Sequence, residues 1–395
     1  MSGNNEPGFS ETISACMVTA PLSARRKPLA LDLFAGAGGT GRGFLEAKFE
    51  IVCAVEIEPS AARTYRANIG CRVEETDLRV LEPQAFRENL GLERRQLDVL
   101  IGCPPCQGFS RMRSSKGASD ERNDLLLRYL AFLSEFQPSY AFFENVLGLV
   151  KGSHGKVFHR ALKDGLQGLG YAITERCVDA ADYGVPQHRE RLILVAGRDG
   201  RVPPFPVATH AEPGCPSVLH GFRQPWRTLR EAIGHLPSIE EARVTGHPAN
   251  HVAAGVGPRV LEFIRRVPKD GGGRLDMPEE FWLPCHRKHR GHADVYGRCW
   301  WDRPANTLTA GCTSVSKGRF VHPEEDRGLT FREAALLQGF PEFYIFYGDK
   351  ISAQIGNAVP PPLAREVALS IRERLILSPA PVSGREAALR GGCSV

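Results

Sequence analysis

Residues 28–200 alternate short apolar runs with segments of helical spacing, and this alternation restricts the possible folds more than any other feature of the chain. Short runs without polar interruption are typical of strands buried on both faces. Strands that alternate with helices predict an α/β fold, in which a mostly parallel, doubly wound sheet carries helices on both sides. The predicted strands are Pro28–Phe34, Ile51–Glu56, Leu97–Ile101, Tyr140–Phe143 and Leu192–Ala196, and the predicted helices are Ala61–Asn68, Asp124–Phe136 and Lys156–Leu169.

The texture of the chain changes after this segment. Residues 201–305 are dense in glycine and proline and show poor periodicity, which predicts a smaller, loop-rich domain. Helical spacing returns in Arg332–Leu337 and Pro362–Leu375. Neither 1–27 nor 378–395 shows a periodic pattern, so we expect a flexible leader and a flexible tail.

Charge, apolar runs and cysteine content bear on the setting of the protein. The net charge of +5 suits a polyanionic partner but does not require one. No apolar run approaches the ~18 residues of a membrane-spanning helix. Glu6 and Glu11 stand where a secretory signal would carry positive charge. Eleven cysteines, an odd number, indicate reduced thiols and a cytosolic or nuclear compartment.

A glycine-rich turn follows the first predicted strand. Gly36, Gly38 and Gly41 form a Gly-x-Gly-x-x-Gly pattern, in which glycine permits a tight turn and the close approach of a ligand. Glu56 closes the next strand, where a carboxylate binds ribose hydroxyls in nucleotide-binding folds, and Asp77 could accept from an adenine amino group. The pattern predicts an adenosine-type ligand, although it suits a nicotinamide enzyme almost as well, and a purely structural turn also remains open.

The predicted strand Leu97–Ile101 runs into the segment Gly102–Ser110, which contains Cys103 and Cys106. Ligands in such folds bind beyond the carboxyl ends of the strands, so this segment is expected to face the glycine turn. The Cys-x-x-Cys spacing also occurs in redox pairs and zinc sites. The sequence contains no second pair of this spacing, which favours a single reactive thiol.

Charged residues accompany the remaining strands. Glu144 ends an apolar run, where a carboxylate is costly to bury without a partner or a purpose. Arg189 and Arg191 flank Glu190, so in an extended segment they point the same way and suit an anion or a carbonyl edge. A capping or salt-bridged glutamate and a solvated charged stretch are the structural alternatives.

Six motifs, in order, resemble those of the DNA (cytosine-5)-methyltransferase family across roughly residues 28–375. They are Leu31–Phe44, Gly102–Ser110, Glu144–Val146, Gln187–Arg191, Arg303–Thr309 and Gln354–Pro360. The resemblance implies a Rossmann-like class I methyltransferase domain, S-adenosylmethionine as cofactor and double-stranded DNA as substrate. The cofactor-binding residues that it implies are Phe34, Gly36, Gly38, Gly39, Thr40, Glu56, Ile57, Asp77, Leu78, Pro104, Asn357, Ala358 and Val359. Ile57 stands where many relatives have an aromatic residue, so thinner packing on the adenine is expected there.

The resemblance also implies roles in the chemistry. Cys106 would add as a thiolate to carbon 6 of cytosine, so that carbon 5 can take the methyl group. Glu144 would hold the N3 and amine edge of the base. Arg191, together with Arg189, would hold O2 or a neighbouring phosphate and complete the catalytic set. Because carbon 6 is inaccessible inside a duplex, the target base must be flipped out.

Residues 201–305 occupy the position of the family's target-recognition domain, and basic residues beside aromatic ones there suit contacts with phosphates and base edges. The segment Gln107–Arg122 is predicted to be a mobile lid, with a disordered linker as the alternative. The predicted DNA-binding residues are Ser110, Arg111, Arg113, Gln187, Arg287, Lys288, Arg290, Arg298 and Thr307. The cysteines and histidines between Cys285 and Cys299 match no standard zinc spacing, so no metal site is predicted.

The resemblance divides the chain into six parts. They are a leader (1–27), the first part of the catalytic domain (28–200), the target-recognition domain (201–305), a hinge and return segment (306–344), the C-terminal part of the catalytic domain (345–377) and a tail (378–395). We expect a bacterial-type monomer without a membrane segment, cytoplasmic and associated with the nucleoid. A cognate restriction endonuclease acting on the same site is a candidate partner.

Three other functions remain as alternatives. A transfer RNA methyltransferase, from one branch of the same family, would carry a Cys-Phe-Thr tripeptide that this sequence lacks. An inactive DNA-binding regulator is disfavoured by the intact set of Cys106, Glu144, Arg189 and Arg191. A nicotinamide oxidoreductase would leave Pro104–Gln107 unexplained.

Overall fold

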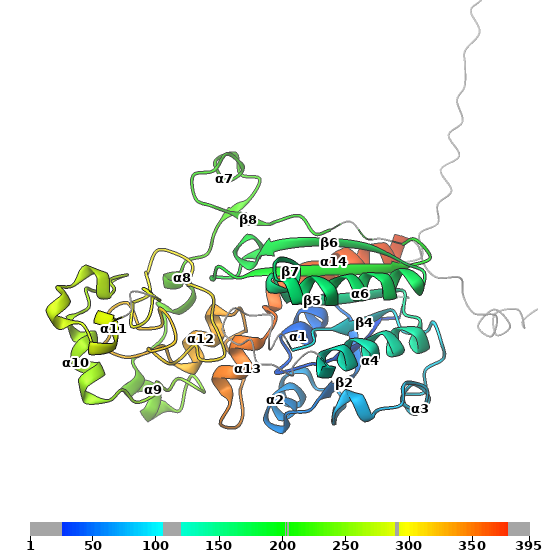
Figure 1. Ribbon diagram of the computed structural model, residues 1–395, viewed down its shortest axis with the longest axis horizontal. Helices are drawn as coiled ribbons and strands as arrows, with labels where there is room; N and C mark the ends of the chain where they lie inside the picture. The colour runs from blue at the N-terminus through cyan, green and yellow to red at the C-terminus, as the bar shows by residue number, and fades with distance from the viewer. Residues whose placement is uncertain (1–25, 106–119, 202, 204, 289–291, 378–395) are drawn as a thin grey trace, which may run out of the picture.

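The computed structural model describes residues 26–105, 120–201, 203, 205–288 and 292–377 (Figure 1). Its centre is a seven-stranded sheet in the order β3-β2-β1-β4-β5-β7-β6. The pairs from β3 to β5 are parallel, whereas β7 runs antiparallel to β5 and β6, which confirms the predicted α/β class. The strands are β1 (Leu29–Leu33), β2 (Glu50–Glu56), β3 (Val73–Glu75), β4 (Val99–Gly102), β5 (Tyr140–Val146), β6 (Tyr171–Asp179) and β7 (Glu190–Arg198).

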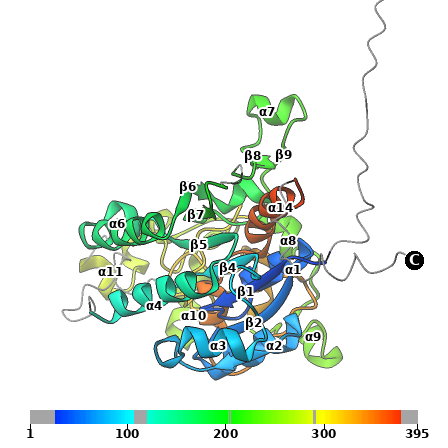
Figure 2. The same ribbon diagram turned by 90° about the vertical axis from the view of Figure 1, so that its right-hand side faces the viewer.

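Alternate residues of the strands enter two separate apolar cores. Ala30 and Phe142 pack on one face of the sheet with helices α1, α2 and α14, while Leu31 and Phe143 pack on the other with α3, α4 and α6. Successive residues of a strand point to opposite faces of the sheet, so a strand buried on both faces contributes alternately to the two cores. The two views show helices on both sides of the sheet (Figures 1 and 2). The helices of this domain are α1 (Gly39–Glu46), α2 (Pro59–Ile69), α3 (Pro83–Asn89), α4 (Asp120–Phe136), α5 (Gly148–Lys151), α6 (Ser153–Gly168), α12 (Phe331–Leu337), α13 (Ile351–Asn357) and α14 (Pro361–Leu377), with short 3₁₀ turns η2 (Leu78–Val80) and η3 (Ala180–Tyr183).

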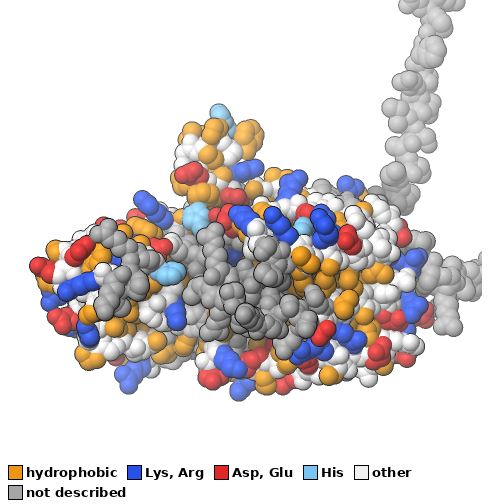
Figure 3. Space-filling view, viewed as in Figure 1, with side chains coloured by type: hydrophobic (Ala, Val, Ile, Leu, Met, Phe, Trp, Pro, Cys, Tyr) orange, Lys and Arg blue, Asp and Glu red, His pale blue; other side chains and the backbone are white. Residues whose placement is uncertain are grey.

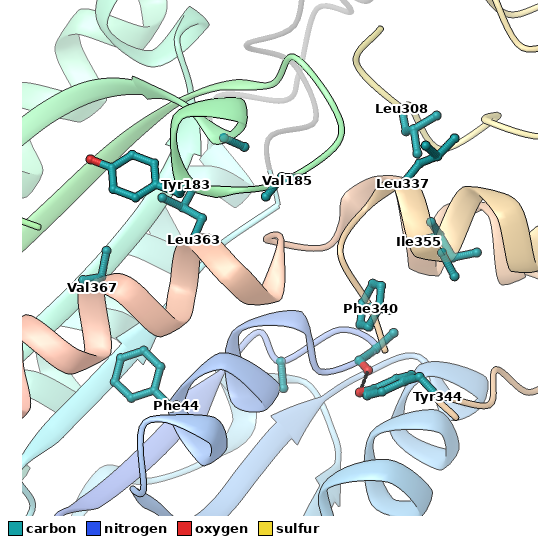
Figure 4. Close-up of a cluster of buried hydrophobic side chains, with 14 of the residues drawn as sticks. Phe44, Tyr183, Val185, Leu308, Leu337, Phe340, Tyr344, Ile355, Leu363 and Val367 are labelled. Atoms are coloured by element: carbon teal, nitrogen blue, oxygen red, sulfur yellow. Dashed lines mark hydrogen bonds between the residues drawn. The ribbon is translucent and has the colours of Figure 1, made fainter. Parts of the chain in front are cut away.

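The last helix of the described chain packs on the first one. A Cβ added at Gly43 of α1 would lie 2.6 Å from the Cβ of Ala364 in α14, so only glycine allows this approach. Figure 4 shows Phe44 of α1 beside Leu363 and Val367 of α14 within one apolar cluster. The C-terminal helices therefore complete a core that the first strands begin.

The sequence did not predict β3, β6 or α3. Strand β6 lies at the edge of the sheet, where its residues are mostly half-buried or exposed. It carries Glu175 and Arg176 at its centre, so it forms no apolar run. Edge strands face water along one side and do not need the apolar pattern of a central strand.

The described residues of the region after the sheet form only short helices and strands. Some of them, among them Leu229, Ile233 and Trp301, pack in the large core that includes Ala30, and others form two small cores. Its longest helix is α10, Pro258–Arg266. The small cores are Phe263, Val267 and Met277 in one case and Ile264, Val315 and Val321 in the other, so residues on both sides of position 305 share a core. The other elements are β8 (His210–Ala211), α7 (Pro216–Leu219), β9 (Gln224–Pro225), α8 (Leu229–Ile233), α9 (Ile239–Thr245), η4 (Arg274–Asp276), η5 (Glu279–Phe281) and α11 (Pro284–Lys288).

Two surface features complete the description. Strands β8 and β9 carry α7 outward as a projection, on which apolar side chains gather, among them the exposed Leu219 and Phe222 (Figure 3). None of the helices in the described part of the chain is both long and apolar enough to cross a membrane.

Candidate active site

The predicted site residues converge on one edge of the sheet because parallel strands end on the same side. Leu33 of β1 lies opposite Gly102 of β4, and Gly102 lies opposite Phe143 of β5. The turn after β1, Glu56 at the end of β2, the loop after β4 and Glu144 near the end of β5 therefore share this edge. Ligands of open α/β sheets bind at this edge.

The turn after β1 has the backbone of a ligand cradle. Phe34 and Gly36 have φ angles of 59° and 54°, and Gly38 has a φ of 93°, which places three residues in the left-handed region. A Cβ at Gly36 would meet nothing within 4 Å among the described residues, whereas one at Gly39 would lie 2.1 Å from the carbonyl oxygen of Val359. The structure thus brings the predicted C-terminal cofactor residues against the glycine turn.

Acidic and apolar groups beside this turn suit an adenosine-type ligand. The amide of Gly36 donates to Glu56 Oε2 at 2.7 Å, and the amide of Glu58 donates to Oε1 at 2.8 Å, which fixes the Glu56 carboxylate at the turn. Burial raises the pKa of Glu56 more than these bonds lower it. Ile57 follows with 61% of its surface exposed, although its side chain is large and apolar. A ribose and an adenine ring are the ligand parts that a fixed carboxylate and an open apolar side chain serve.

The other predicted cofactor residues vary in accessibility. Asp77 begins η2, and its carboxylate pairs with Arg79 at 2.6 Å, so its hydrogen bonds with the guanidinium lower its pKa. Leu78 is buried, and Thr40 lies in the first turn of α1 with its hydroxyl 3.7 Å from the thiol sulfur of Cys103. Burial raises the pKa of Cys103 well above its usual range. A raised pKa disfavours the thiolate form, so Cys103 is a poor candidate for the nucleophile.

Glu144 and Arg191 form a buried pair where β5 meets β7. Arg191 Nε lies 2.9 Å from Glu144 Oε1, and the two side chains are 12% and 7% exposed. Burial raises the pKa of Glu144, and the charges of Arg191 and Arg189 only partly oppose this. A carboxyl group with a raised pKa can hold a proton near neutral pH and deliver it to a base.

The loop that leads to the predicted nucleophile is fixed by a neighbouring strand. Asn145 Nδ2 donates to the carbonyl oxygen of Pro104 at 3.2 Å, and its Oδ1 accepts from the amide of Val146 at 2.9 Å. Pro104 is buried. Cys106 comes two residues later and lies outside the described residues, as do Ser110, Arg111 and Arg113.

Arg189 and Gln187 turn into the protein. Arg189 is 2% exposed and donates to the carbonyl oxygens of Leu308, Gly356 and Ala358. Gln187 is fully buried, accepting from the amide of Leu308 and donating to Gln338. The side-chain amide of Gln187 is enclosed and bonded to protein groups in this structure, and its contact with DNA stays a prediction.

The predicted recognition residues separate into buried and exposed groups. Arg298 has no exposed surface, and its guanidinium donates to the carbonyl oxygens of Ile264, Val267, His322 and Glu325 and to Asp326. All five of these bonds are to protein groups, and the contact of Arg298 with DNA stays a prediction.

Two other predicted DNA-binding residues remain accessible. Arg287 is exposed on α11 and Thr307 is exposed after the recognition region. Thr307 donates its hydroxyl to the carbonyl oxygen of His188 at 2.7 Å. Lys288 is the last residue of α11, and Arg290 lies outside the described residues.

Three residues at this edge were not predicted from the sequence. Asp32 at the end of β1 accepts from Tyr65 at 2.9 Å, and burial raises its pKa to about 7. Asn145 is part of the Glu-Asn-Val motif, and this motif could have identified Asn145 as a site residue. Gln338 follows α12 and is surrounded in the sequence by apolar residues and glycine. No motif marks it, so only the tertiary structure shows that its side chain lies beside Gln187.

A mostly parallel sheet with a glycine turn, a fixed carboxylate and a Glu–Arg ion pair at the carboxyl ends of its strands is the arrangement expected of an α/β enzyme. The family model for C-5 cytosine-specific DNA methylases matches residues 30–373 of this chain. The chain therefore belongs to the C-5 cytosine-specific DNA methylase family. It is an enzyme that methylates cytosine in DNA and requires a methyl donor.

Individual relatives agree with the family. The Type II methylase M.HgiDII of Herpetosiphon aurantiacus is 34% identical over 87% of this chain and 95% of its own length. The Type II methyltransferase M1.HphI of Haemophilus parahaemolyticus is 36% identical over 86% of each chain. The crystal structure of a proposed DNA modification methyltransferase from an E. coli prophage matches with a TM-score of 0.67 at 22% identity, covering 88% of this chain and 99% of that one, and it supports the fold.

Proposed function

We propose that this enzyme transfers a methyl group from S-adenosylmethionine to carbon 5 of a flipped-out cytosine in a specific double-stranded DNA sequence, through a covalent bond to Cys106. The observation that carries this proposal is the buried Glu144–Arg191 pair, with a separation of 2.9 Å, beside the loop that leads to Cys106. It supplies an acid and a fixed cation where a cytosine edge would enter.

The residues beside the glycine turn fit S-adenosylmethionine. Glu56 would accept from the ribose hydroxyls, because each of its oxygens keeps capacity beyond the one amide bond that it receives. Ile57 and Leu78 would flank the adenine, and Asp77 would face its amino group. Gly36, Gly38, Gly39, Phe34, Thr40 and Pro104, with Asn357, Ala358 and Val359, would enclose the rest of the ligand. When bound, this cofactor supplies a methyl group on a positively charged sulfur.

Cys106 would make cytosine reactive by covalent addition. Its thiolate forms a bond to carbon 6, and the electron pair of the 5,6 double bond becomes available at carbon 5. After methylation, loss of the carbon 5 proton restores the double bond and expels the thiolate. Because a free thiol has a pKa of about 8.5, a positive local field is required for this step. Arg191 lies at the same edge of the sheet and carries the appropriate charge.

Glu144 would supply the proton that the addition requires. In its protonated form it donates to N3 of cytosine, and this neutralises the negative charge that develops on the ring. Its raised pKa favours that form. Arg191 would orient the carboxyl group and would bind O2 of the base, whereas the bonds of Arg189 to three backbone carbonyls support a positioning role.

The remaining DNA contacts and partners extend this proposal. Thr307, Arg287, Lys288 and Arg290 would contact the duplex, together with Ser110, Arg111 and Arg113, which follow the nucleophile in the sequence. The relatives named Type II support a cognate restriction endonuclease that acts on the same site. We further propose a monomer that acts on nucleoid DNA in a bacterial cytoplasm.

The test is transfer of tritium from labelled S-adenosylmethionine to mixed-sequence duplex DNA, with Cys106→Ser as the comparison and transfer RNA as a second substrate. Label at carbon 5 of cytosine in DNA that disappears in Cys106→Ser is the expected result, and bisulfite sequencing of the product then identifies the site. Label in transfer RNA alone, or equal label with Cys106→Ser, would contradict the proposal.

A further inference from the structure

Three buried polar side chains meet where the chain returns from the recognition region. Gln187, Arg189 and Gln338 are each at most 2% exposed. Gln187 Nε2 donates to Gln338 Oε1 at 2.7 Å, and Gln338 Nε2 donates in turn to the carbonyl oxygen of Ala358. Burial of an amide or a guanidinium group costs desolvation free energy unless hydrogen bonds within the protein replace those with water. We call this set the polar clasp.

The polar clasp joins segments that are far apart in sequence. Both the amide and the carbonyl of Leu308 are bound, by Gln187 at 2.8 Å and by Arg189 at 2.8 Å. Arg189 also binds the carbonyl oxygens of Gly356 at 2.8 Å and Ala358 at 3.1 Å. The clasp therefore connects the start of β7, the return from the recognition region and the end of α13.

Each of these segments leads directly to a ligand site. Gly356 and Ala358 flank Asn357, and Ala358 is followed by Val359, whose carbonyl oxygen lies against Gly39 of the glycine turn. Arg191 is two residues beyond Arg189 and pairs with Glu144. Leu308 is next to the exposed Thr307. One network thus touches the chain beside the cofactor site, the cytosine site and the DNA-facing return segment.

We propose that the polar clasp couples the two substrates, so that binding of the cofactor raises the affinity for DNA, and that Gln187, Arg189 and Gln338 are its positioning residues. The inference rests on the proposed function, since it takes residues 357–359 as part of the cofactor site. Coupling of this kind is reciprocal, because a ligand that favours one arrangement of the shared segments favours it for the other ligand too.

Gln338 offers the sharpest test because it touches neither ligand. Gln338→Met keeps the size of the side chain but removes the bonds to Gln187 and Ala358. Gln338→Glu keeps an acceptor for Gln187 and loses the donor to Ala358, unless the introduced carboxyl group is protonated. Gln354→Met is the matched control, because Gln354 is also buried, belongs to α13 and bonds instead to Ser60 and the carbonyl oxygen of Tyr347.

The readouts are the Kd of S-adenosylhomocysteine by calorimetry and the Kd of a methylatable duplex with and without that ligand. We expect Gln338→Met to weaken S-adenosylhomocysteine by about tenfold, as for the loss of one to two buried hydrogen bonds, and to abolish its enhancement of DNA binding. Gln338→Glu should recover affinity as the pH falls from about 8 to about 6, because protonation of its carboxyl restores the donor. Gln354→Met should leave the enhancement unchanged even where it lowers the melting temperature.

Two results would overturn the proposed coupling but not the proposed function. In the first, S-adenosylhomocysteine enhances DNA binding by Gln338→Met to within twofold of the wild-type enhancement. In the second, Gln354→Met loses this enhancement as fully as Gln338→Met does. Failure of the wild-type protein to bind S-adenosylhomocysteine would overturn the proposed function and the coupling together. A loss of melting temperature without any change in the ratio of DNA affinities would assign the clasp to folding only and would also contradict the proposal.

Discussion

The backbone amides and carbonyls of the sheet domain and of the recognition region find their hydrogen-bond partners in different ways. In the sheet, amides and carbonyls pair along neighbouring strands, and apolar side chains fill two large cores. In the described part of the recognition region, strands are short, so loop carbonyls have few backbone partners in ladders. Its apolar residues either join the large core of the sheet domain or form two small cores. Buried arginines provide the missing donors there.

Arg298 and Arg319 illustrate the second way. Arg298 binds four backbone carbonyls and Asp326, and Arg319 binds the carbonyls of Gly271, Gly272 and Arg298 while it lies 4.2 Å from the centre of the Trp300 ring. A guanidinium has five donors in a fixed plane and can therefore hold several loops at once. A loop-rich region can reach a defined shape with little apolar core if such donors are buried within it.

The largest effect is expected in the sheet domain, from Glu144→Gln. The amide can bond to cytosine but cannot deliver a proton, so kcat should fall by about 10²–10⁴-fold. In the wild type, activity that depends on protonated Glu144 should decline as the pH rises through its raised pKa, and this alkaline limb should vanish in the variant. Methylation rates between about pH 6 and 9 check this; an unchanged alkaline limb would remove Glu144 as the acid.

The recognition region should respond most in stability, through Arg298→Met. This change removes the guanidinium donor of four carbonyls and of Asp326, and leaves Lys269 bonded to that carboxylate. Breaking a buried charged network costs about 3–5 kcal/mol. Thermal unfolding measures the loss. Leu100→Ala in the fully buried sheet core is the comparison, with an expected cost of about 2–5 kcal/mol. If Arg298→Met costs less than about 1 kcal/mol, the buried arginine does not replace an apolar core and the contrast between the regions fails.

The two regions should also differ in how one carboxylate responds to pH. Burial raises the pKa of Asp32 from 3.8 to about 7, and no described residue bonds to its Oδ1. Since the folded state binds this proton more tightly, the free energy of unfolding falls as the pH rises between these values. Asp32→Asn should therefore increase stability at pH 8, by up to about 4 kcal/mol for a shift of about three units, and much less at pH 5.

Asp326, in the return segment that bonds to Arg298 and Lys269 of the recognition region, gives the opposite sign. Burial alone would raise its pKa, but hydrogen bonds from Lys269 and Arg298 lower it below the usual value. Its stabilising contribution is present above its unfolded pKa and is lost as the pH falls through the folded pKa. Asp326→Asn should therefore destabilise the protein at pH 7 and have little effect in strong acid. Denaturant titrations at several pH values test both variants, and equal signs would refute the contrast.

The smallest effect concerns glycine positions within the sheet domain. Gly36 and Gly70 have φ angles of 54° and 77°, and a Cβ at either would meet no described atom within 4 Å. Alanine at each should cost about 1 kcal/mol through backbone strain alone. Only Gly36→Ala should also raise the KM for S-adenosylmethionine, because we assign Gly36, and not Gly70, to the cofactor site. An equal KM in both variants would place the ligand elsewhere.

Most of the sheet and its ligand edge could be predicted from the sequence. Central strands such as β1 and β5 are buried on both faces, so their apolar runs reveal them without knowledge of their neighbours. The glycine turn and Glu56 follow such strands directly, and their place is fixed by local chain geometry. Edge strand β6 escaped prediction because its pattern depends on water on one side.

The sequence by itself determined the fold class, the family and the order of the motifs, because these depend on residue types at short spacings. Only the tertiary structure decided what each polar side chain faces. Arg189 and Arg191 look equivalent in sequence, yet one binds carbonyls from distant segments and the other binds Glu144. Gln187 and Arg298 have the chemistry of DNA-binding residues and are buried instead. The physical reason is that the partner of a polar group is set by which remote segments fold against it, and neighbours in sequence carry no record of that.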